Sequence, residues 1–373
     1  MTARLLYLVN DAAYFLSHRL ALAQAARDAG WEVHVATAPS PPQQQIREAG
    51  FPAHDLPLSR SGLRPDREIR ALIATCRLLR QLKPDLVHCV ALKATVAGGL
   101  AARIRSVPAR VFAIAGLGHV FTERDWQSRG LRLMFRLLFP LLVSDRSRVI
   151  VQNRDDLQRI AMNERLRART VLIAGSGVDL ERYRPAPEPD GPVTVLLASR
   201  MIWKKGIGDY VAAAERLAAE GLDIRFLMAG GGDPGNPASI PEQQLDTWNR
   251  DGPVQWLGHR SDMPALLGAC HVFCLPSYYG EGIPKCLIEA AAAGRPIVTT
   301  DMPGCRDIVR HDQNGLLVAP RDVDGLAAAI RRLAEDPALR RRYGDRGRDM
   351  VCADFSLDAV VAQTMAVYRD LTA

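Results

Sequence analysis

The stretch VFCLPSYYGEGIPKCLIEAAAA, residues 272–293, contains a strand, a loop and a helix in direct succession. Its first four residues form a short apolar run typical of a buried strand, and the loop that follows contains Gly280, Gly282 and Pro284. Residues 285–293 are predicted to form a helix. A strand that leads through a glycine loop into a helix is the repeating unit of doubly wound α/β folds.

The same alternation of apolar strands and helices extends from this stretch toward both ends of the chain. Continuous apolar strands of this kind predict parallel sheets with helices on both faces. The proline-rich segment 179–192 (DLERYRPAPEPDGP) interrupts the alternation and indicates a linker. We therefore predict an α/β fold of two Rossmann-like doubly wound domains, residues 1–182 and 190–356. Ligands are expected at the carboxyl ends of the strands, in a cleft between the domains.

The predicted elements alternate regularly in both halves. The predicted strands cover residues 4–10, 32–36, 85–90, 110–115, 149–152 and 170–173, and then 193–198, 224–229, 254–257, 272–275, 296–299 and 315–318. The predicted helices cover residues 16–29, 67–82 and 94–105, and then 207–219, 263–269, 285–293, 323–335 and 337–350.

The composition of the chain is that of an ordinary globular protein. Of its 373 residues, 48% are hydrophobic and 24% are charged, which argues against disorder and supports domains with real cores. No apolar run reaches the ~18 residues that a membrane-spanning helix needs, and residues 1–9 turn polar too soon for a signal peptide. Seven scattered cysteines, an odd number, indicate a reducing compartment, with the cytoplasm as the default.

The net charge of +7 is distributed unevenly. Residues 1–180 hold 26 basic and 15 acidic side chains, a net charge of +11, whereas residues 181–373 hold 22 and 26, a net charge of −4. A basic first half indicates an anionic partner such as a phospholipid surface or a diphosphate-bearing acceptor. No nucleic-acid motif accompanies it, so no nucleic acid is expected. The segment Gly130–Val143 is either a buried core helix or a surface helix that enters anionic lipid.

Two carboxylates belong to the stretch quoted at the outset. Glu281 lies in the glycine loop, and Glu289 lies on the following helix, about one turn past Lys285. The loop glycines let backbone N–H groups approach a ligand closely, and the helix N-terminus favours a phosphate. Carboxylates in this setting can accept hydrogen bonds from sugar hydroxyls. The alternative is a solvated loop acid and an exposed helix acid.

A basic segment, ASRMIWKKG, follows another predicted strand at residues 198–206. Arg200 can bind a phosphate through two N–H groups, and Lys205 can add a point charge. The alternative is a basic surface turn.

Together these segments resemble a known enzyme family. ASR…WKKG, LMAGGG, VQWLG and PSYYGEGIPKCLIEAAAAGRPIVTTDMPGCRDIV are similar to the family 4 retaining glycosyltransferases. They most resemble the branch that builds capsule, O-antigen and other glycans on polyprenyl diphosphate carriers. The resemblance implies the GT-B fold, in which two Rossmann-like domains enclose a donor–acceptor cleft. The ending DFS and the helix after it, residues 357–373, resemble the family's last helix, which packs back on the first domain.

The resemblance also implies roles for residues of the second half. Arg200 and Lys205 match the pair that holds the donor diphosphate, and Arg260 lies where the family's backbone binds the nucleobase. Glu281 matches the glutamate on the donor sugar, and Glu289 matches the one on the ribose. The loop around sugar and phosphate corresponds to Gly282, Ile283 and Pro284. The donor substrate is expected to be a UDP-linked hexose or N-acetylhexosamine, with no cofactor and no metal ion, because the cationic pair replaces the metal.

The first half departs from the family's pattern. Many members have a double glycine where this chain has residues 10–14 (NDAAY), and many have a histidine where it has Ala115 and Gly116. His119, a few residues later, is therefore the candidate catalytic histidine. His18 and Lys93 are the candidates for contacts with the acceptor. Each of the three can instead be a structural or solvated residue.

These observations predict a retaining glycosyltransferase that acts on a lipid-linked saccharide, in the cytoplasm or peripherally on the inner face of the cell membrane. Arg200 and Lys205 take up the charge that develops on the leaving diphosphate. The acceptor hydroxyl attacks from the same face, and its proton passes to the departing phosphate oxygen. Two alternatives stay open: a nucleotide-sugar 2-epimerase of the same architecture, which needs no acceptor, and a non-catalytic protein that binds anionic lipid.

Overall fold

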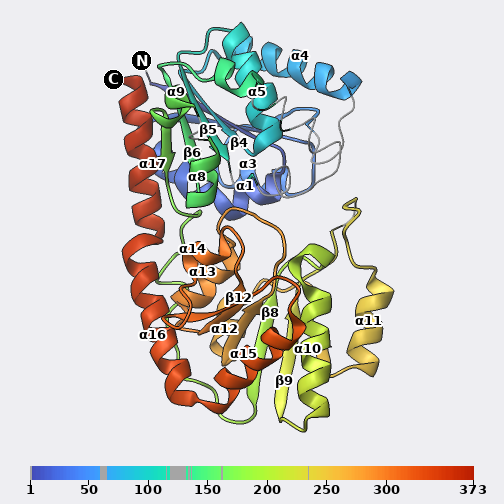
Figure 1. The fold of residues 1–373 in the computed structure, drawn as a ribbon. Coiled ribbons are helices and arrows are strands. Elements are labelled where there is room, and N and C mark those ends of the chain that lie inside the picture. The colour runs from blue at the N-terminus through green and yellow to red at the C-terminus, as the bar shows by residue number, and fades with distance from the viewer. Residues whose placement is uncertain are drawn as a thin grey trace. The chain divides into compact units, whose positions relative to one another are not determined.

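The structure, a computed structural model, describes residues 2–58, 65–114, 116–117, 132, 135, 137–160, 163–233 and 235–373. The chain divides into two compact units, residues 1–177 together with 357–373, and residues 178–356. Each unit is a parallel sheet covered by helices on both faces (Figure 1), which confirms the predicted doubly wound α/β fold. The predicted linker, residues 179–192, belongs to the second unit, which begins at residue 178.

The first unit is built on a seven-stranded sheet of order β3-β2-β1-β4-β5-β6-β7. Its strands are β1 Arg4–Val9, β2 Glu32–Thr37, β3 Ala53–Asp55, β4 Leu86–Val90, β5 Ala109–Ile114, β6 Ser147–Val151 and β7 Thr170–Leu172. Its helices include α1 Ala12–His18, α2 Leu20–Asp28, α3 Gln43–Glu48, α4 Pro65–Leu82, α5 Leu92–Ile104, α8 Arg154–Ile160, α9 Glu164–Arg167 and α17 Leu357–Thr372.

Helix α17 joins the first unit from the far end of the chain. Its buried Met365 and Tyr368 share one apolar core with residues of β1, β2, α1 and α2. The Tyr368 hydroxyl lies 2.9 Å from the Tyr7 hydroxyl and 2.5 Å from Nδ1 of His88. A second core, on the other face of the sheet, contains residues of α4 and α5. The last helix is therefore part of the first unit's interior, because apolar packing and a buried polar contact both hold it there.

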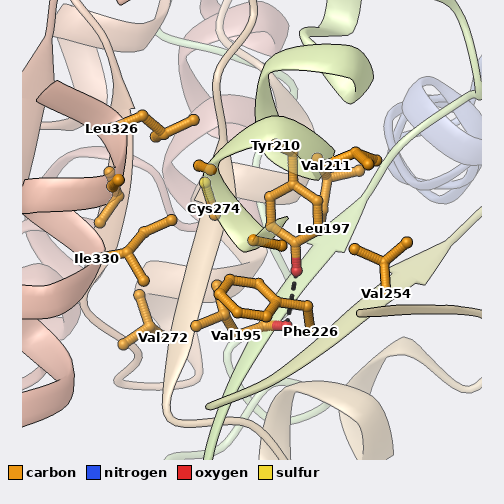
Figure 2. Packing of buried hydrophobic residues seen from close by; sticks show 14 of the residues in the cluster. Val195, Leu197, Tyr210, Val211, Phe226, Val254, Val272, Cys274, Leu326 and Ile330 are labelled. Atoms are coloured by element: carbon orange, nitrogen blue, oxygen red, sulfur yellow. Dashed lines mark hydrogen bonds between the residues drawn. The ribbon is translucent and has the colours of Figure 1, made fainter. Parts of the chain in front are cut away.

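The second unit is built on a six-stranded sheet of order β10-β9-β8-β11-β12-β13. Its strands are β8 Val193–Ala198, β9 Ile224–Ala229, β10 Val254–Trp256, β11 Val272–Leu275, β12 Ile297–Thr300 and β13 Gly315–Val318. Its helices include η1 Trp203–Lys205, α10 Ile207–Ala219, α11 Glu242–Asp251, α12 Met263–Gly268, α13 Lys285–Ala292, α14 Cys305–Ile308, α15 Val323–Glu335 and α16 Pro337–Asp354. In its core, Tyr210 donates a hydrogen bond to the carbonyl of Val195 at 2.9 Å (Figure 2).

The first helix begins earlier than the sequence predicted. We expected helix from residue 16, but α1 begins at Ala12. The Asp11 carboxylate accepts hydrogen bonds from the backbone N–H groups of Ala13, at 2.8 Å, and Tyr14. This side-chain cap satisfies N–H groups that otherwise have no partner at a helix start. The segment NDAAY is therefore mostly helical rather than a loop.

The described part of the segment Gly130–Val143 is helical from residue 137 to residue 142, with buried and exposed side chains. Within the described part of the segment, one set of side chains is buried and another is exposed. The buried set is Phe135, Phe139, Leu142 and Val143, and the exposed set is Leu137, Leu138 and Leu141. Arg136 lies outside the described residues. In the portion of the chain that the structure covers, no helix is both long and apolar enough to cross a membrane.

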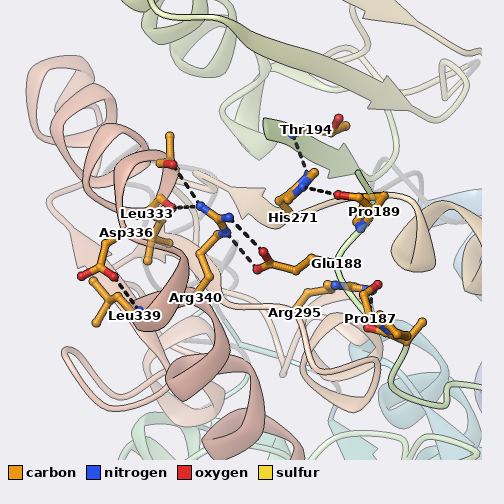
Figure 3. Close-up of polar contacts among 12 residues, drawn as sticks. Pro187, Glu188, Pro189, Thr194, His271, Arg295, Leu333, Asp336, Leu339 and Arg340 are labelled. Atoms are coloured by element: carbon orange, nitrogen blue, oxygen red, sulfur yellow. Dashed lines mark hydrogen bonds and ion pairs between the residues drawn. The ribbon is translucent and has the colours of Figure 1, made fainter. Parts of the chain in front are cut away.

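Arginine side chains attach the proline-rich segment to the second unit. Arg340 donates to both carboxylate oxygens of Glu188, at 2.8 and 2.9 Å (Figure 3). Arg295 donates to the carbonyls of Leu267, at 2.8 Å, and Ala186, at 2.9 Å. The side chain of Arg340 is 6% exposed and that of Glu188 is 22% exposed, so the pair is shielded from water. These contacts explain why residues 178–189 lie in the second unit.

Loss of the Arg340–Glu188 ion pair should destabilise the second unit. Arg340→Ala leaves the Glu188 carboxylate without its partner, so we expect the free energy of unfolding to fall by about 2 kcal/mol. Urea denaturation followed by circular dichroism measures this. Arg250→Ala is the matched control, because Arg250 pairs with Asp251 on an exposed surface and its loss should leave stability unchanged. Equal stability of the two variants would contradict a stabilising role for the Arg340–Glu188 ion pair.

Candidate functional site

Two predicted site residues meet at the carboxyl edge of the second unit's sheet. Strand β8 leads into η1, which ends at Lys205, and β11 leads into the loop that contains Glu281. These two strands are neighbours in the sheet, so the segments that follow them lie side by side. Nζ of Lys205 lies 2.6 and 2.7 Å from the two carboxylate oxygens of Glu281. The fold thus joins a cation and an anion that are 76 positions apart in the chain.

This ion pair is largely excluded from water. The side chain of Lys205 is 8% exposed and that of Glu281 is 19% exposed. Burial by itself lowers the pKa of Lys205, but the charge of Glu281 beside it outweighs burial and holds the pKa above its usual value. The Tyr279 ring centroid lies 5.5 Å from Nζ, and Ser277 Oγ donates to Glu281 at 3.3 Å. Lys205 is therefore a fixed positive charge at neutral pH.

The second predicted cation, Arg200, forms an ion pair with Asp233. Asp233 follows β9 and the glycine run LMAGGG, and its carboxylate also accepts from Nδ2 of Asn236 at 3.0 Å. Asp233 is buried, whereas the side chain of Arg200 is 47% exposed, so part of the guanidinium faces solvent. Sequence reasoning missed Asp233. Its signal was a carboxylate directly after a strand and a glycine run.

Two glycines let the loops around the ion pair approach each other. Gly206, which caps η1, has a φ of +75°, and a Cβ there would lie 2.0 Å from the carbonyl oxygen of Pro276. Gly304, which precedes α14, has a φ of +85°, and a Cβ there would lie 1.8 Å from the carbonyl oxygen of Gly282. Both values are far below van der Waals contact, so only glycine fits. The loop of residues 276–284, which we call the donor loop after its predicted role, is therefore closely approached by backbone at Gly206 and Gly304.

Glu289 is a buried carboxylate in α13. Nζ of Lys285, one helical turn earlier, lies 3.7 Å from Oε1 of Glu289. Burial raises the pKa of Glu289 above its usual value, although Lys285 and a hydrogen bond from Tyr183 partly oppose this effect. A buried carboxylate with incomplete compensation is a group whose charge costs stability. That cost is expected where a fold keeps a carboxylate ready for a ligand.

The other predicted residues of the second half have different surroundings. Gly282, Ile283 and Pro284 are buried in the donor loop, directly before α13. Arg260 lies on an exposed loop after β10 and donates to both oxygens of Asp262, at 2.8 and 2.5 Å. Arg260 therefore lies near the end of β10, but its guanidinium forms an ion pair with Asp262, two residues further along the chain.

The candidates of the first half lie on separate helices of the first unit. His18 ends α1, stacks on Tyr14 with ring centroids 4.1 Å apart, and lies 2.7 Å from Ser17 Oγ through Nδ1. Lys93 lies in the first turn of α5, with Nζ 3.3 Å from a carboxylate oxygen of Glu68. His119 lies outside the described residues.

Asp156 is a buried carboxylate of the first unit that the sequence did not predict as a candidate residue. Asp156, in α8, accepts hydrogen bonds from the backbone N–H of Leu117, at 3.1 Å, and from Nδ2 of Asn153, at 3.0 Å. Burial raises the pKa of Asp156 to about 6, against these hydrogen bonds. Asp156 thus fixes the backbone of Leu117, three residues after the end of β5.

Comparison with known proteins gives the family. The family described as "Glycosyl transferases group 1" matches residues 192–336, and "Glycosyl transferase 4-like" matches residues 4–153. The chain is 30% identical over 372 residues to a phosphatidyl-myo-inositol mannosyltransferase of Mycolicibacterium smegmatis, covering 95% of this chain and 90% of that one. The protein belongs to this glycosyltransferase family. Membership of this family confirms that the protein is a glycosyltransferase. It argues against both alternatives, the nucleotide-sugar 2-epimerase and the non-catalytic lipid-binding protein.

Further similarities place the glycosyltransferase among GT-B proteins. It is 27% identical over 350 residues, 87% of this chain and 90% of the other, to a Campylobacter jejuni N,N'-diacetylbacillosaminyl-diphospho-undecaprenol alpha-1,3-N-acetylgalactosaminyltransferase. Its fold is similar to that of Anabaena HepE, solved in complex with UDP and glucose, with a TM-score of 0.79 at 19% identity over 98% of this chain and 99% of that one. The predicted GT-B fold is thereby confirmed.

The two glutamates of the site should respond to neutralisation in opposite ways. Because the pKa of Glu289 is raised in the folded state, this residue favours folding at low pH, and its contribution is lost as the pH rises through the folded-state pKa. Glu289→Gln should therefore raise Tm near neutral pH, and the gain should vanish below about pH 4. Glu281→Gln leaves Lys205 buried without an anion and should cost about 2–3 kcal/mol.

Thermal unfolding of both variants across pH 4–8 tests this contrast. The parent protein at each pH is the reference. A Glu289→Gln variant that is less stable than the parent at pH 7 would show that the carboxylate's partners outweigh its burial.

Proposed function

We propose that this glycosyltransferase transfers a hexose or N-acetylhexosamine, with retention at the anomeric carbon, from a UDP-sugar to a saccharide on polyprenyl diphosphate. The Campylobacter jejuni relative is named for transfer to a diacetylbacillosaminyl-diphospho-undecaprenol, which supports this acceptor class. The UDP in the complex of Anabaena HepE supports the nucleotide. The buried Lys205–Glu281 pair is the observation that carries the proposal, because it joins the cation proposed to bind the phosphate to the carboxylate proposed to bind the sugar.

In the proposed reaction, the cations of the second unit bind the donor diphosphate. The bond between the anomeric carbon and the phosphate oxygen breaks, and Arg200 and Lys205 stabilise the negative charge left on UDP. A bond forms from the acceptor hydroxyl oxygen to the anomeric carbon on the same face. The hydroxyl proton passes to the departing phosphate oxygen, which balances the charge. Glu281 accepts hydrogen bonds from donor sugar hydroxyls, and Glu289 does so from the ribose.

The proposal includes neither a cofactor nor a metal ion. Two cations after β8 supply the charge that a divalent metal would otherwise supply to a diphosphate. Arg200 keeps part of its guanidinium toward solvent while Asp233 orients it. Lys205 keeps its charge because Glu281 compensates for its burial. The first unit would supply the acceptor contacts, for which His18 and Lys93 are the described candidates.

We further propose that a defined surface of the first unit binds an anionic membrane. Seven of the eight large hydrophobic side chains exposed in the described chain lie on α4, α5 and helical residues 137–142. Hydrogen bonds join these helices: Arg105 Nε donates to the Cys76 carbonyl at 3.2 Å, and Arg103 donates to the Leu141 carbonyl. This apolar surface comprises Ile69, Ile73, Leu100, Ile104, Leu137, Leu138 and Leu141.

Basic side chains accompany the apolar surface. On α4, Arg77 and Arg80 are exposed and continue the stripe of Ile69 and Ile73 at helical spacing. An exposed apolar surface of this kind marks a partner, and basic residues beside it favour anionic lipid. The proposed acceptor is itself a membrane lipid, so docking here would bring the enzyme to its substrate. These features support our proposal that the enzyme acts peripherally on the inner face of the cell membrane.

Loss of Lys205 should abolish the leaving-group assistance. We expect Lys205→Ala to lower kcat by about 10²–10³ with a UDP-sugar panel and a polyprenyl-diphosphate N-acetylhexosamine acceptor. Arg225→Ala, at the amino end of β9, is the control and should keep the parental rate. The anomeric configuration of the product by NMR tests retention, and addition of EDTA tests metal independence. A Lys205→Ala variant with the parental rate would contradict the proposed site.

Exposed leucines of the apolar surface should be needed for vesicle binding. The double substitution Leu137→Ser and Leu141→Ser should weaken binding to phosphatidylcholine vesicles with phosphatidylglycerol at least tenfold, because about 1.5 kcal/mol or more is lost per leucine. Both side chains are about 60% exposed, so folding should be unaffected. Arg77→Glu should weaken binding, whereas Arg346→Glu on α16 should not. Equal binding of the parent to neutral and anionic vesicles would count against anionic lipid.

A further inference from the structure

Arg321 contacts Tyr278 of the donor loop and interacts electrostatically with Asp209. Tyr278 belongs to the loop after β11, Arg321 follows β13, and Asp209 lies in the first turn of α10. Cζ of Arg321 lies 4.2 Å from the ring centroid of Tyr278, which is the geometry of a cation–π contact. None of the three residues has a role in the proposed reaction. Their contact therefore needs an explanation of its own.

Asp209 provides a reason for the arginine's position. Its Oδ2 atom is buried and has no hydrogen-bond partner among the described residues. Burial raises the pKa of Asp209, and the positive charge of Arg321 opposes this effect. A carboxylate with one unsatisfied oxygen attracts a nearby guanidinium. The charge of Arg321 thus offsets part of the cost of burying Asp209, while its guanidinium lies over the ring of Tyr278.

The backbone of Arg321 is in a conformation that arginine disfavours. Its φ of +63° lies in the left-handed region, which glycine adopts with less strain. A glycine would therefore serve the turn after β13 at lower cost. The contacts of the Arg321 side chain offset this backbone strain. A glycine at this position would relieve the strain but would lack these contacts.

Tyr278 connects this contact to the donor site. Its backbone N–H donates to the carbonyl of Lys204 at 3.1 Å, one residue before Lys205. The preceding residue, Ser277, donates through Oγ to the same carbonyl and to the Glu281 carboxylate, each at 3.3 Å. A shift of Tyr278 would therefore be transmitted to both members of the Lys205–Glu281 pair.

We propose that Arg321 is a positioning residue for the donor loop. By lying over Tyr278, it holds the loop in the conformation in which Lys205 and Glu281 meet. Arg321 does not contact the donor in this proposal; it acts through Tyr278 alone. The inference rests on the proposed function, because the donor loop is the loop that binds the UDP-sugar.

Kinetics of Arg321 variants test the proposal, with the UDP-sugar that the parent turns over as the probe. We expect Arg321→Ala and Arg321→Gly to raise the KM for this donor about three- to tenfold, the range of a cation–π contact. Arg321→Lys keeps a cation over the ring and should recover most of the loss. Arg321→Gly also relieves the backbone strain, so its Tm should not fall even though its KM rises. A purely structural role would not separate these two readouts.

Two comparisons make the test specific. Arg342→Ala removes another arginine–tyrosine contact of the second unit, 5.5 Å from the Tyr343 ring centroid on α16, and should leave the donor KM unchanged. Tyr278→Ala should raise the KM as Arg321→Ala does, and the double variant should add little, because both changes remove one contact. Additive effects would show that Arg321 acts by another route.

The outcomes separate this inference from the proposed function. A parental KM in Arg321→Gly, together with loss of transfer in Lys205→Ala, overturns the role of Arg321 and leaves the enzyme's function standing. A parental rate in Lys205→Ala overturns the proposed function itself, and the positioning role falls with it.

Discussion

The ion pair of Lys205 and Glu281 is the interaction on which the second unit's site depends. Removing two charges from water costs several kcal/mol per ion, and only close pairing and added hydrogen bonds can offset that cost. The pair meets this demand through two short contacts and a hydrogen bond from Ser277. It also requires β8 and β11 to be neighbours and two backbone segments to approach without a Cβ at Gly206. Strand order, glycine positions and side-chain chemistry thus converge on one contact.

The same pairing explains how the site can be both stable and ready to bind. Each cation proposed to hold the donor diphosphate has a carboxylate partner here, Glu281 for Lys205 and Asp233 for Arg200. A phosphate can therefore replace a carboxylate as the partner without leaving a buried cation alone. Glu289 behaves differently, because burial outweighs its partners and its charge costs stability. Groups held at such a cost are typical of ligand sites rather than of structural ion pairs.

Long-range contacts also decide which parts of the chain belong to which unit. Glu188 lies in a segment whose prolines and charges are typical of a linker, yet Arg340 binds it across 152 positions. Tyr368 lies near the end of the chain, yet its hydroxyl meets that of Tyr7 across 361 positions. Both cases follow from the same constraint: a buried polar group without a partner costs stability, so most find one, wherever in the sequence that partner lies.

Local sequence determined the elements and the residue types of the site. The predicted strands 193–198 and 272–275 coincide with β8 and β11, because a short apolar run between turn residues has few other stable conformations. The glycine loop, Glu281 and the basic segment were recognisable because each directly follows such a run. The start of α1 was not predicted, since the cap of Asp11 on Ala13 is a side-chain geometry rather than an apolar pattern.

Only the tertiary structure decided which of these residues meet. The pairing of Arg200 with Asp233 and the contact of Arg321 with Tyr278 depend on the order of strands in the sheet, which no local pattern encodes. The exposure of one side of residues 137–142 depends on what packs against the other side. A sequence pattern reports what each segment prefers, whereas partners and burial arise from segments that are distant in the chain.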